Sequence, residues 1–475
     1  MGNNKVNFIS SVSKLFLSSA MAQFIGIISL PILSRLYSPI SFGEWALTQS
    51  IVMIFVVLSS MRYELAIPLP KSNSEAISIV FICSILTILA SILSMIFMFF
   101  FGNLLFDIKL QYFLLWTLPF LIISGSLNQL ALMWLTRSSF FNIYSLSQFL
   151  LAILIATLSI IFSYIDNSSK GLISATLLAF TINSIVMWTF IFFMSKKSNN
   201  RNFKLSNLLM TIKKFKSYPI YMTPYTLSSI LRDRIVYFFI SSYVGTAQLG
   251  LYSFAQRISN APNNLIASAF RPVFYNLITN EESKASTVNL IQTTIKFLIS
   301  IILPYSIFFF FYAEKIVTFI FGDEWSEAAI FFMILIIPMI PQTLSNWLDR
   351  YFDALGRQDL AFKLEISFSI FTIFSLTLLF FFNFDFYLII FIQASITSIY
   401  FVTWTIILFH ISEMGIRILF KILVYFSIIF ILSLSLSAAL FYFFNLGTSI
   451  LIYLLFNMII VFQLMDKNIK ILKQY

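Results

Sequence analysis

Residues 217–243 read SYPIYMTPYTLSSILRDRIVYFFISSY, a stretch long enough to cross a bilayer that carries Arg232, Asp233 and Arg234 beyond its middle. Residues 250–279 form a second long apolar stretch, and it carries arginines as well. About 20 helical residues cover the roughly 30 Å hydrocarbon core of a membrane. A charge at the centre of such a helix costs on the order of 3 kcal/mol. Charges kept there indicate a function, and basic ones favour an anionic cargo.

The composition places the whole chain in a membrane. Its 475 residues are 59% hydrophobic and only 10% charged, and a soluble protein of that composition could not cover its surface with polar groups. The net charge of +11 could suggest a nucleic-acid partner. That class is excluded because the basic residues lie mostly in short connections between apolar runs and not along one solvated face.

The apolar runs predict an all-α polytopic membrane protein with about 14 transmembrane helices. A β-barrel is excluded because the runs are about twice the length of a barrel strand and do not alternate with period two. The predicted spans are residues 14–34, 43–60, 76–101, 111–135, 144–164, 172–194, 217–243, 250–279, 289–312, 328–348, 361–382, 386–409, 416–444 and 448–464.

The charges of the connections predict the orientation. If the N-terminus is cytoplasmic and the spans alternate, most Lys and Arg residues outside the spans fall on the inside. The outside connections then hold Arg35, Lys109, Lys170 and Lys315. Both termini are therefore expected in the cytoplasm.

An internal repeat predicts two helical bundles. Residues 36–51 align without gaps on residues 243–258, and WLTR at 134–137 echoes WLDR at 347–350. The aligned pairs include Gly43 with Gly250, Trp45 with Tyr252, Gln49 with Gln256 and Ile51 with Ile258. Transporters are often built from such repeats, with the cargo site between the halves. Chance similarity in a chain rich in Ile, Leu, Phe and Ser is the alternative.

The repeat and the connections together predict a domain plan of two pseudo-symmetric six-helix bundles plus two C-terminal helices. The predicted parts are an N-terminal bundle at residues 1–194, a basic cytoplasmic linker at 195–216, a C-terminal bundle at 217–409, and two last helices with a tail at 410–475. The linker, rich in lysine, could also act only as a positive-inside anchor near anionic lipid.

Polar stripes at helical spacing mark the candidate site. In the predicted span 250–279, one stripe places on a single helix face Ser253, Arg257, Asn260, Asn264, Ser268 and Arg271. Such stripes face other helices or water, because they cannot face lipid without a large penalty. The candidate cargo-binding residues are Arg232, Arg234, Arg257, Asn260, Asn264, Arg271 and Lys296. Interhelical hydrogen bonding is the alternative, but it does not require guanidinium or ammonium groups. Asp233 either pairs with a neighbouring arginine or acts as a protonatable coupling group.

Several kinds of chemistry have no support in the sequence. It contains no Gly-x-x-x-x-Gly-Lys phosphate loop, so nucleotide hydrolysis through that motif is excluded. The single histidine, His410, and the single cysteine cannot form a zinc or iron cluster. No cofactor, metal site or enzymatic activity is therefore expected, and transport would be driven by an ion gradient, of protons or sodium, or by the cargo gradient.

Three short segments resemble a known family. RLYSPISFGEWA at 35–46, MRYELAIPLPK at 61–71 and LGLYSFA at 249–255 are similar to signatures of the polysaccharide-export branch of the multidrug/oligosaccharidyl-lipid/polysaccharide exporter superfamily. The chain looks most like bacterial O-antigen (Wzx-type) flippases. Asp233 and Arg234 add to the resemblance, which extends over nearly the whole chain.

The resemblance implies alternating access around a central cationic cavity in the bacterial inner membrane. The implied cargo is an undecaprenyl-pyrophosphate-linked oligosaccharide, flipped from the cytoplasmic to the periplasmic leaflet. Implied partners are membrane lipids, a polysaccharide polymerase and a chain-length regulator. The cations within the predicted spans fit this cargo, because a diphosphate needs cations and arginine supplies forked donors.

Two other functions compete with this interpretation. The first is an ion-coupled exporter of another cargo, either lipid II or a small cationic drug, although a cation exporter would be expected to bury acids. The second is a membrane enzyme of the same pathway, such as a polymerase, although no predicted connection is long enough for a catalytic domain.

Overall fold

The computed structural model describes residues 20–195, 206–279, 284–348, 351–352, 357–412 and 416–458. These residues are almost entirely helical and contain no strand, which confirms the all-α fold class. Ten helices are long and apolar enough to span a membrane, and Ala20–Leu36 and Leu446–Met458 are shorter apolar helices. The predicted total of about 14 spans also counts α8 and α9, which are not among these helices.

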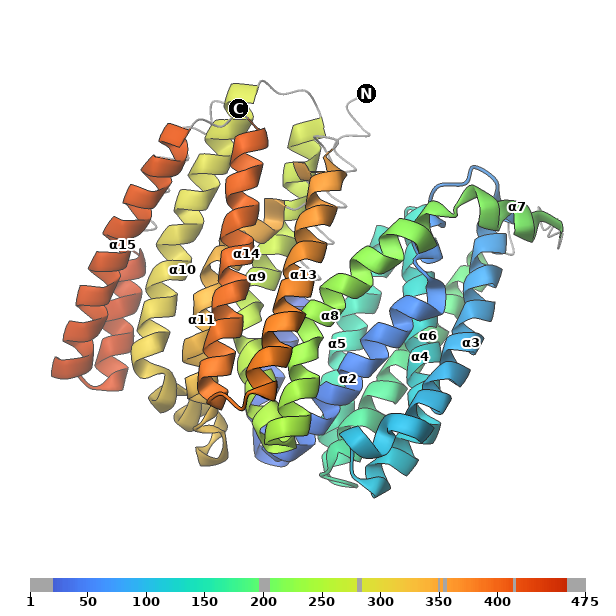
Figure 1. Cartoon of the computed structure of the whole chain (residues 1–475), viewed down its shortest axis with the longest axis horizontal. Helices are drawn as coiled ribbons and strands as arrows, with labels where there is room; N and C mark the ends of the chain where they lie inside the picture. Colours follow the sequence, from blue (N-terminus) through green and yellow to red (C-terminus); the bar gives the residue numbers. More distant parts are fainter. Residues whose placement is uncertain are drawn as a thin grey trace. The chain divides into compact units, whose positions relative to one another are not determined.

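The helices follow the predicted order, and most extend beyond the predicted limits by a few residues (Figure 1). They are α2 (Pro39–Ser60), α3 (Asn73–Leu105), α4 (Ile108–Arg137), α5 (Phe141–Ser163), α6 (Ser169–Ser195), α7 (Ser206–Lys214), α8 (Thr223–Phe239), α9 (Thr246–Thr279), α10 (Lys284–Phe321), α11 (Ala328–Ser345), α13 (Gln358–Phe381), α14 (Phe386–Ile411) and α15 (Ile416–Phe443).

The chain forms two compact units. Unit 1 comprises the described residues of Met1–Ser253 and Glu365–Phe382, and unit 2 comprises those of Phe254–Leu364 and Asn383–Tyr475. Helices α9 and α13 each contribute residues to both units. The division into bundles at residues 195–216 and 410 rests on the internal repeat and on the charges of the connections, and it stays a prediction.

Helix α2 is the centre of unit 1. It packs against α3, α4, α6 and α8, and most of its residues are buried. Ser38 caps its first turn by accepting a hydrogen bond from the Ser41 amide, and Pro39 occupies the first helical position, where a missing N–H has no consequence. Trp45 donates from Nε1 to Thr176 Oγ1 at 3.0 Å and so ties α2 to α6.

Two glycines bring α2 and α9 into backbone contact. A Cβ added at Gly43 would lie 1.9 Å from the Thr246 carbonyl oxygen, and one added at Gly250 would lie 1.8 Å from the Pro39 carbonyl oxygen. These four residues are related by the same offset in the sequence, so the contact is reciprocal, as at a two-fold axis. Only glycine allows helix backbones to approach this closely. The aligned glycines of the predicted repeat therefore lie against each other.

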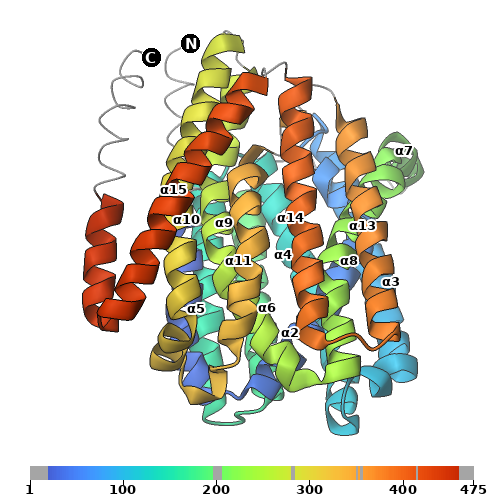
Figure 2. The same ribbon diagram turned by 60° about the vertical axis from the view of Figure 1, so that its left-hand side comes forward.

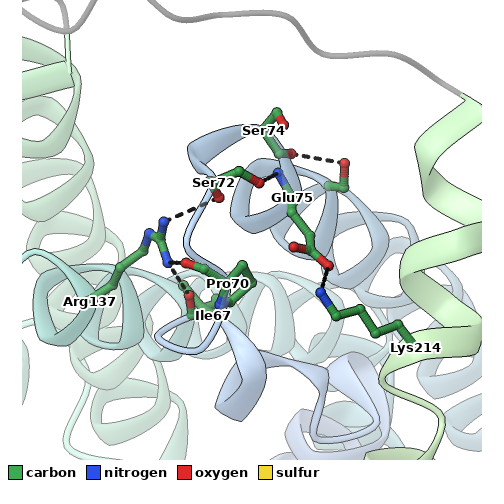
Figure 3. Close-up of polar contacts among 8 residues, drawn as sticks. Ile67, Pro70, Ser72, Ser74, Glu75, Arg137 and Lys214 are labelled. Carbon is green, nitrogen blue, oxygen red and sulfur yellow. Dashed lines mark hydrogen bonds and ion pairs between the residues drawn. The ribbon is translucent and has the colours of Figure 1, made fainter.

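Part of the predicted linker is helical. Helix α7 lies beside the start of α3, where Lys214 forms an ion pair with Glu75 (Figures 1 and 3). Phe215, which follows α7, is buried in a cluster that includes Tyr63, Ile79 and Leu130. This cluster gives a physical reason for the helix, because an apolar residue at its end has a core to enter. The basic residues at 196–205 lie outside the described residues.

Four helices form the body of unit 2. Helix α15 packs on α10, α10 on α11, and α11 on α14, so the four lie side by side (Figure 2). At one end, the rings of Phe254 and Trp325 are 4.3 Å apart between their centroids, and both are buried. On α3 in unit 1 and on α15 in unit 2, rows of exposed Ile, Leu and Phe side chains form the kind of surface that hydrocarbon chains can cover.

Candidate functional site

Arg232 is held in a buried ion-pair network. Its Nη1 lies 2.7 Å from Oε1 of Glu365 on α13, and its Nε lies 3.1 Å from Oδ1 of Asp233. The Ser369 hydroxyl donates to the same Glu365 oxygen at 3.4 Å. Arg232 is 7% exposed and Glu365 is 3% exposed. The network satisfies a guanidinium inside a membrane span, where an isolated charge would be very unfavourable.

The pairing of Asp233 with a neighbouring arginine is confirmed by this geometry. The Asp233 side chain is 55% exposed, whereas that of Glu365 is buried. The network therefore joins Arg232 to one buried carboxylate and to one that reaches the surface of the described structure. Sequence reasoning missed Glu365. It lies inside the predicted span 361–382, and the rule that singled out Arg232, a charge within an apolar span, would have found it.

The helix that carries Arg232 is irregular at both ends. A π-helical turn, Tyr218–Met222, precedes α8, and another, Ile240–Val244, follows it. Gly245 then adopts a φ of 122°, which an L side chain rarely tolerates, and breaks the path of the chain before α9. Such π turns occur often at functional sites. Pro219 lies at the start of the first π-helical turn, and Pro224 lies at the start of α8. Their missing amides disrupt few intrahelical hydrogen bonds at these positions.

A second ion pair, in the turn that follows α2, contacts α8. Arg62 donates from Nη1 to Glu64 Oε1 at 3.1 Å and from Nε to Thr226 Oγ1 at 3.0 Å. Glu64 is 2% exposed. Met61 and Arg62 have φ values of 45° and 60°, a left-handed conformation that costs non-glycine residues energy and persists where the surroundings enforce it. The resemblance segment 61–71 is therefore a structured turn that positions Arg62 against α8.

Arg137 holds the same turn at its far end. Its guanidinium donates to the carbonyl oxygens of Ile67, Pro70 and Ser72 (Figure 3). It also donates to Asn73 Oδ1. Four acceptors for one forked donor set leave little freedom to either the arginine or the turn. This residue was noted in the sequence only as part of the repeat, and its role is structural.

Arg234 directly follows Asp233 in the sequence. Its guanidinium lies 4.9 Å from the centroid of the Tyr237 ring, in a cation–π contact. Tyr237 in turn meets Tyr252 edge to face, with centroids 5.8 Å apart. Both tyrosines are buried, so Arg234 is positioned against rigid aromatic rings within unit 1.

The remaining candidates lie in unit 2. Arg257, Asn260 and Arg271 on α9 are half-buried, whereas Asn264 is exposed. Arg271 donates from Nη2 to the Asn346 carbonyl oxygen at 3.2 Å. The predicted polar stripe differs at its start, because Ser253 is 1% exposed and bonds to the Gly250 carbonyl oxygen. The close helix crossing at Gly250 leaves no room for water there.

Lys296 on α10 lies beside a tyrosine of α15. Its Nζ is 5.8 Å from the centroid of the Tyr425 ring, and the Tyr425 hydroxyl is 2.6 Å from Ser300 Oγ. Asn263, which the stripe did not include, is 3% exposed and accepts a hydrogen bond from Asn346 Nδ2 at 3.2 Å. Unit 2 thus sets two cations, Arg271 and Lys296, among hydrogen-bonding groups of α9, α10, α15 and the short 3-10 helix Asn346–Leu348.

Unit 2 also contains a large apolar cavity. Its volume is about 730 Å³, and it is lined by side chains of α10, α11, α14 and α15. The lining is almost wholly aliphatic and aromatic, with Ile299, Phe310, Pro341, Val402 and Phe426 among its residues. A cavity without charged groups suits an apolar chain and excludes a polar head group.

The comparisons with known proteins agree with this architecture. Residues 32–330 match the family described as polysaccharide biosynthesis protein, and among curated proteins none matches the chain. A structure of the lipid II flippase MurJ in an inward closed conformation is similar over 98% of this chain and 99% of its own, with a TM-score of 0.72 and 16% identity.

Two further structures share the fold more distantly. A Vibrio cholerae MATE transporter has a TM-score of 0.54 at 13% identity and covers 86% of this chain and 96% of its own. A Pyrococcus furiosus transporter of the MOP superfamily has a TM-score of 0.52 at 14% identity, with coverage of 86% and 95%. The fold is that of these multi-pass membrane transporters. Because the family match extends over more than half of the sequence, the chain belongs to the polysaccharide biosynthesis protein family.

Proposed function

We propose that this protein flips an undecaprenyl-pyrophosphate-linked oligosaccharide, such as an O-antigen repeat unit, from the cytoplasmic to the periplasmic leaflet of the bacterial inner membrane. The observation that carries the proposal is the set of cations kept on helices α8, α9 and α10 of a polysaccharide-biosynthesis chain. The diphosphate is the charged part of such a cargo and cannot enter the hydrocarbon core without compensating cations. Guanidinium groups bind it with forked donors.

The cargo's other parts also find matching groups. A polyprenyl tail is apolar and long, and the cavity in unit 2 is apolar and about 730 Å³ in volume. Sugar rings stack on aromatic side chains, of which the chain has many, with 58 phenylalanines and 21 tyrosines. Transport then needs no chemical step, because binding groups exposed alternately to the two leaflets suffice.

We also propose on which side the termini lie, what drives transport and which proteins act next. Both termini lie in the cytoplasm, a proton or sodium gradient drives the cycle, and a polysaccharide polymerase and chain-length regulator act on the delivered units. In this proposal each of the candidate residues contacts the diphosphate or the first sugar in the course of the cycle; they are Arg232, Arg234, Arg257, Asn260, Asn264, Arg271 and Lys296.

A deletion strain tests the function directly. Lipid-linked intermediates are extracted, identified by mass, and assigned to a leaflet by their accessibility to a sugar-oxidising reagent that does not cross the membrane. Intact repeat units retained on the inner leaflet support the proposal. Single units that reach the periplasm but are never joined would point to a polymerase, and accumulated lipid II would point to the peptidoglycan precursor as cargo.

A further inference from the structure

The buried partner of Arg232 occupies the place that a cargo anion would need. Glu365 Oε1 lies 2.7 Å from Arg232 Nη1, a short charge-assisted contact, and both side chains are almost wholly buried. Asp233 takes Nε on another edge of the same guanidinium. A phosphate oxygen that approaches Arg232 along its forked edge therefore competes with Glu365 for the same donor.

Carboxylates and phosphates are rival ligands of arginine because both present oxygens at the spacing of the guanidinium fork. In the structure, a carboxylate of the protein fills that role. If a diphosphate replaced it, Glu365 would be left as a buried charge without its strongest partner, which is highly unfavourable in a low-dielectric interior. The exchange becomes favourable once that carboxylate is neutral.

Charged and hydrogen-bonding groups of α8 and α13 surround Glu365. On α8 the neighbouring charged groups are Arg232, Asp233 and Arg234, and Arg234 is directed onto the Tyr237 ring. On α13, the Ser369 hydroxyl contacts the carboxylate and can hydrogen-bond to it in either protonation state. On α2, which packs on α8, the carboxylate of Glu44 has Asp107 and Lys170 as its charged neighbours. The turn after α2 contributes Arg62, which bonds to Thr226 of α8 and forms an ion pair with Glu64.

We propose that Glu365 is an internal counter-anion that holds Arg232 in the empty protein and yields it to the cargo diphosphate by taking up one proton. This inference rests on the proposed function. In the exchange, a proton from water binds a Glu365 carboxylate oxygen, the Nη1–H···Oε1 bond breaks, and the guanidinium, still protonated, donates to a phosphate oxygen. On release the proton leaves and the ion pair forms again.

The charges set the direction in which this exchange helps transport. A diphosphate diester carries two negative charges, and the proton that accompanies it offsets one of them. The loaded site therefore gains a net negative charge, which an inside-negative membrane potential drives outward. The accompanying proton moves against an inward pH gradient, so in this step the membrane potential, and not the pH difference, supplies the driving force. The re-formed ion pair then displaces the cargo, so Glu365 promotes release as well as uptake.

The test is a binding measurement on the whole protein in nanodiscs of neutral lipid. The probe is a short-chain prenyl-pyrophosphoryl-N-acetylglucosamine, a diester whose own charge does not change between pH 5.5 and 8.5. Calorimetry in two buffers of different ionisation enthalpy gives both the affinity and the number of protons taken up. The wild type is expected to take up about one proton, and its affinity to fall by up to about tenfold per pH unit as the pH rises.

Three variants complete the design. Glu365→Gln, a neutral isostere, should bind more tightly at high pH, without pH dependence and without proton uptake. The double variant R232Q/E365Q keeps a neutral pair, so it should fold and yet bind weakly at every pH. The matched control is Asp359→Asn, on the same helix, because Asp359 is exposed and pairs with Arg357; it should behave as the wild type. Unfolding temperatures in detergent report that each variant is folded.

The outcomes separate this inference from the proposed function. If the wild type binds the probe and Glu365→Gln keeps the same proton uptake and pH dependence, Glu365 is not the counter-anion, although the flippase function stands. The same conclusion follows if R232Q/E365Q binds as the wild type does. If the wild type does not bind the diphosphate probe at all, the proposed function fails together with the inference.

Discussion

The contact between Gly43 and Gly250 makes a quantitative prediction. An alanine methyl at position 43 would lie 1.9 Å from the Thr246 carbonyl oxygen, whereas ordinary contact begins at 3.4 Å. Both groups belong to helix backbones, so no side-chain rotation can relieve the clash. The helices α2 and α9 must therefore separate by about 1.5 Å at the crossing, and overpacking of this kind costs about 1–3 kcal/mol.

The reciprocity of the contact sharpens the prediction. Gly250→Ala places its methyl 1.8 Å from the Pro39 carbonyl oxygen, so the two single variants should destabilise the protein equally. Once one methyl has separated the helices, the second finds room already made. The double variant should therefore lose clearly less free energy of unfolding than the sum of the two single losses.

The assay is unfolding of the purified protein in detergent, with Gly26→Ala as the control. Gly26 lies in the helix Ala20–Leu36 with nothing within 4 Å of an added Cβ, so alanine there should be neutral or slightly stabilising. Equal stability of Gly43→Ala and Gly26→Ala would refute the close crossing. Strict additivity in the double variant would refute the claim that both glycines serve one contact.

Three other perturbations test other parts of the structure. Arg257→Ala should abolish display of surface polysaccharide while the protein stays in the membrane, as immunoblots of membrane fractions and surface staining would report; normal display would remove Arg257 from the cargo site. Arg137→Ala removes a donor set that satisfies four acceptors of one turn, so the free energy of unfolding should fall by about 1–3 kcal/mol and limited proteolysis should cut near residue 70 sooner; unchanged cleavage would contradict the clamp. Arg232→Ala leaves Glu365 buried without this partner and should cost about 3–5 kcal/mol, whereas replacing both residues with apolar ones of similar volume should cost far less; equal losses would show that the pair does not act as a unit.

Much of the fold could be predicted because its signals are local. Apolar runs of sufficient length predict membrane helices, and the structure has a helix in every predicted span. The proline at the start of α2 and the glycine before α9 mark helix boundaries through their own backbone preferences. Helix α7 was the exception, since its nine residues alone carry too little apolar surface to predict that Phe215, which follows it, would enter a core.

The candidate site was predictable in part. The charges of α8 were found because each is improbable on its own inside a span, and Asp233 pairs with Arg232 as the neighbouring positions suggest. Glu365 carried the same signal but lies far along the chain, and without its pairing to Arg232 it has no evident role. Ser253 was placed on a wet face by helical spacing alone, yet helix packing at Gly250 buries it.

By itself, the sequence determined that the chain spans a membrane many times, that its helices α8 to α10 carry polar stripes, and that its charges include a cluster of arginines. These follow from hydropathy and helical periodicity, which depend on neighbours within a few turns. Only the tertiary structure decided that Glu365 neutralises Arg232 and that Gly43 meets Gly250. Both contacts join residues more than a hundred positions apart, and such contacts depend on how helices pack, which no local pattern specifies.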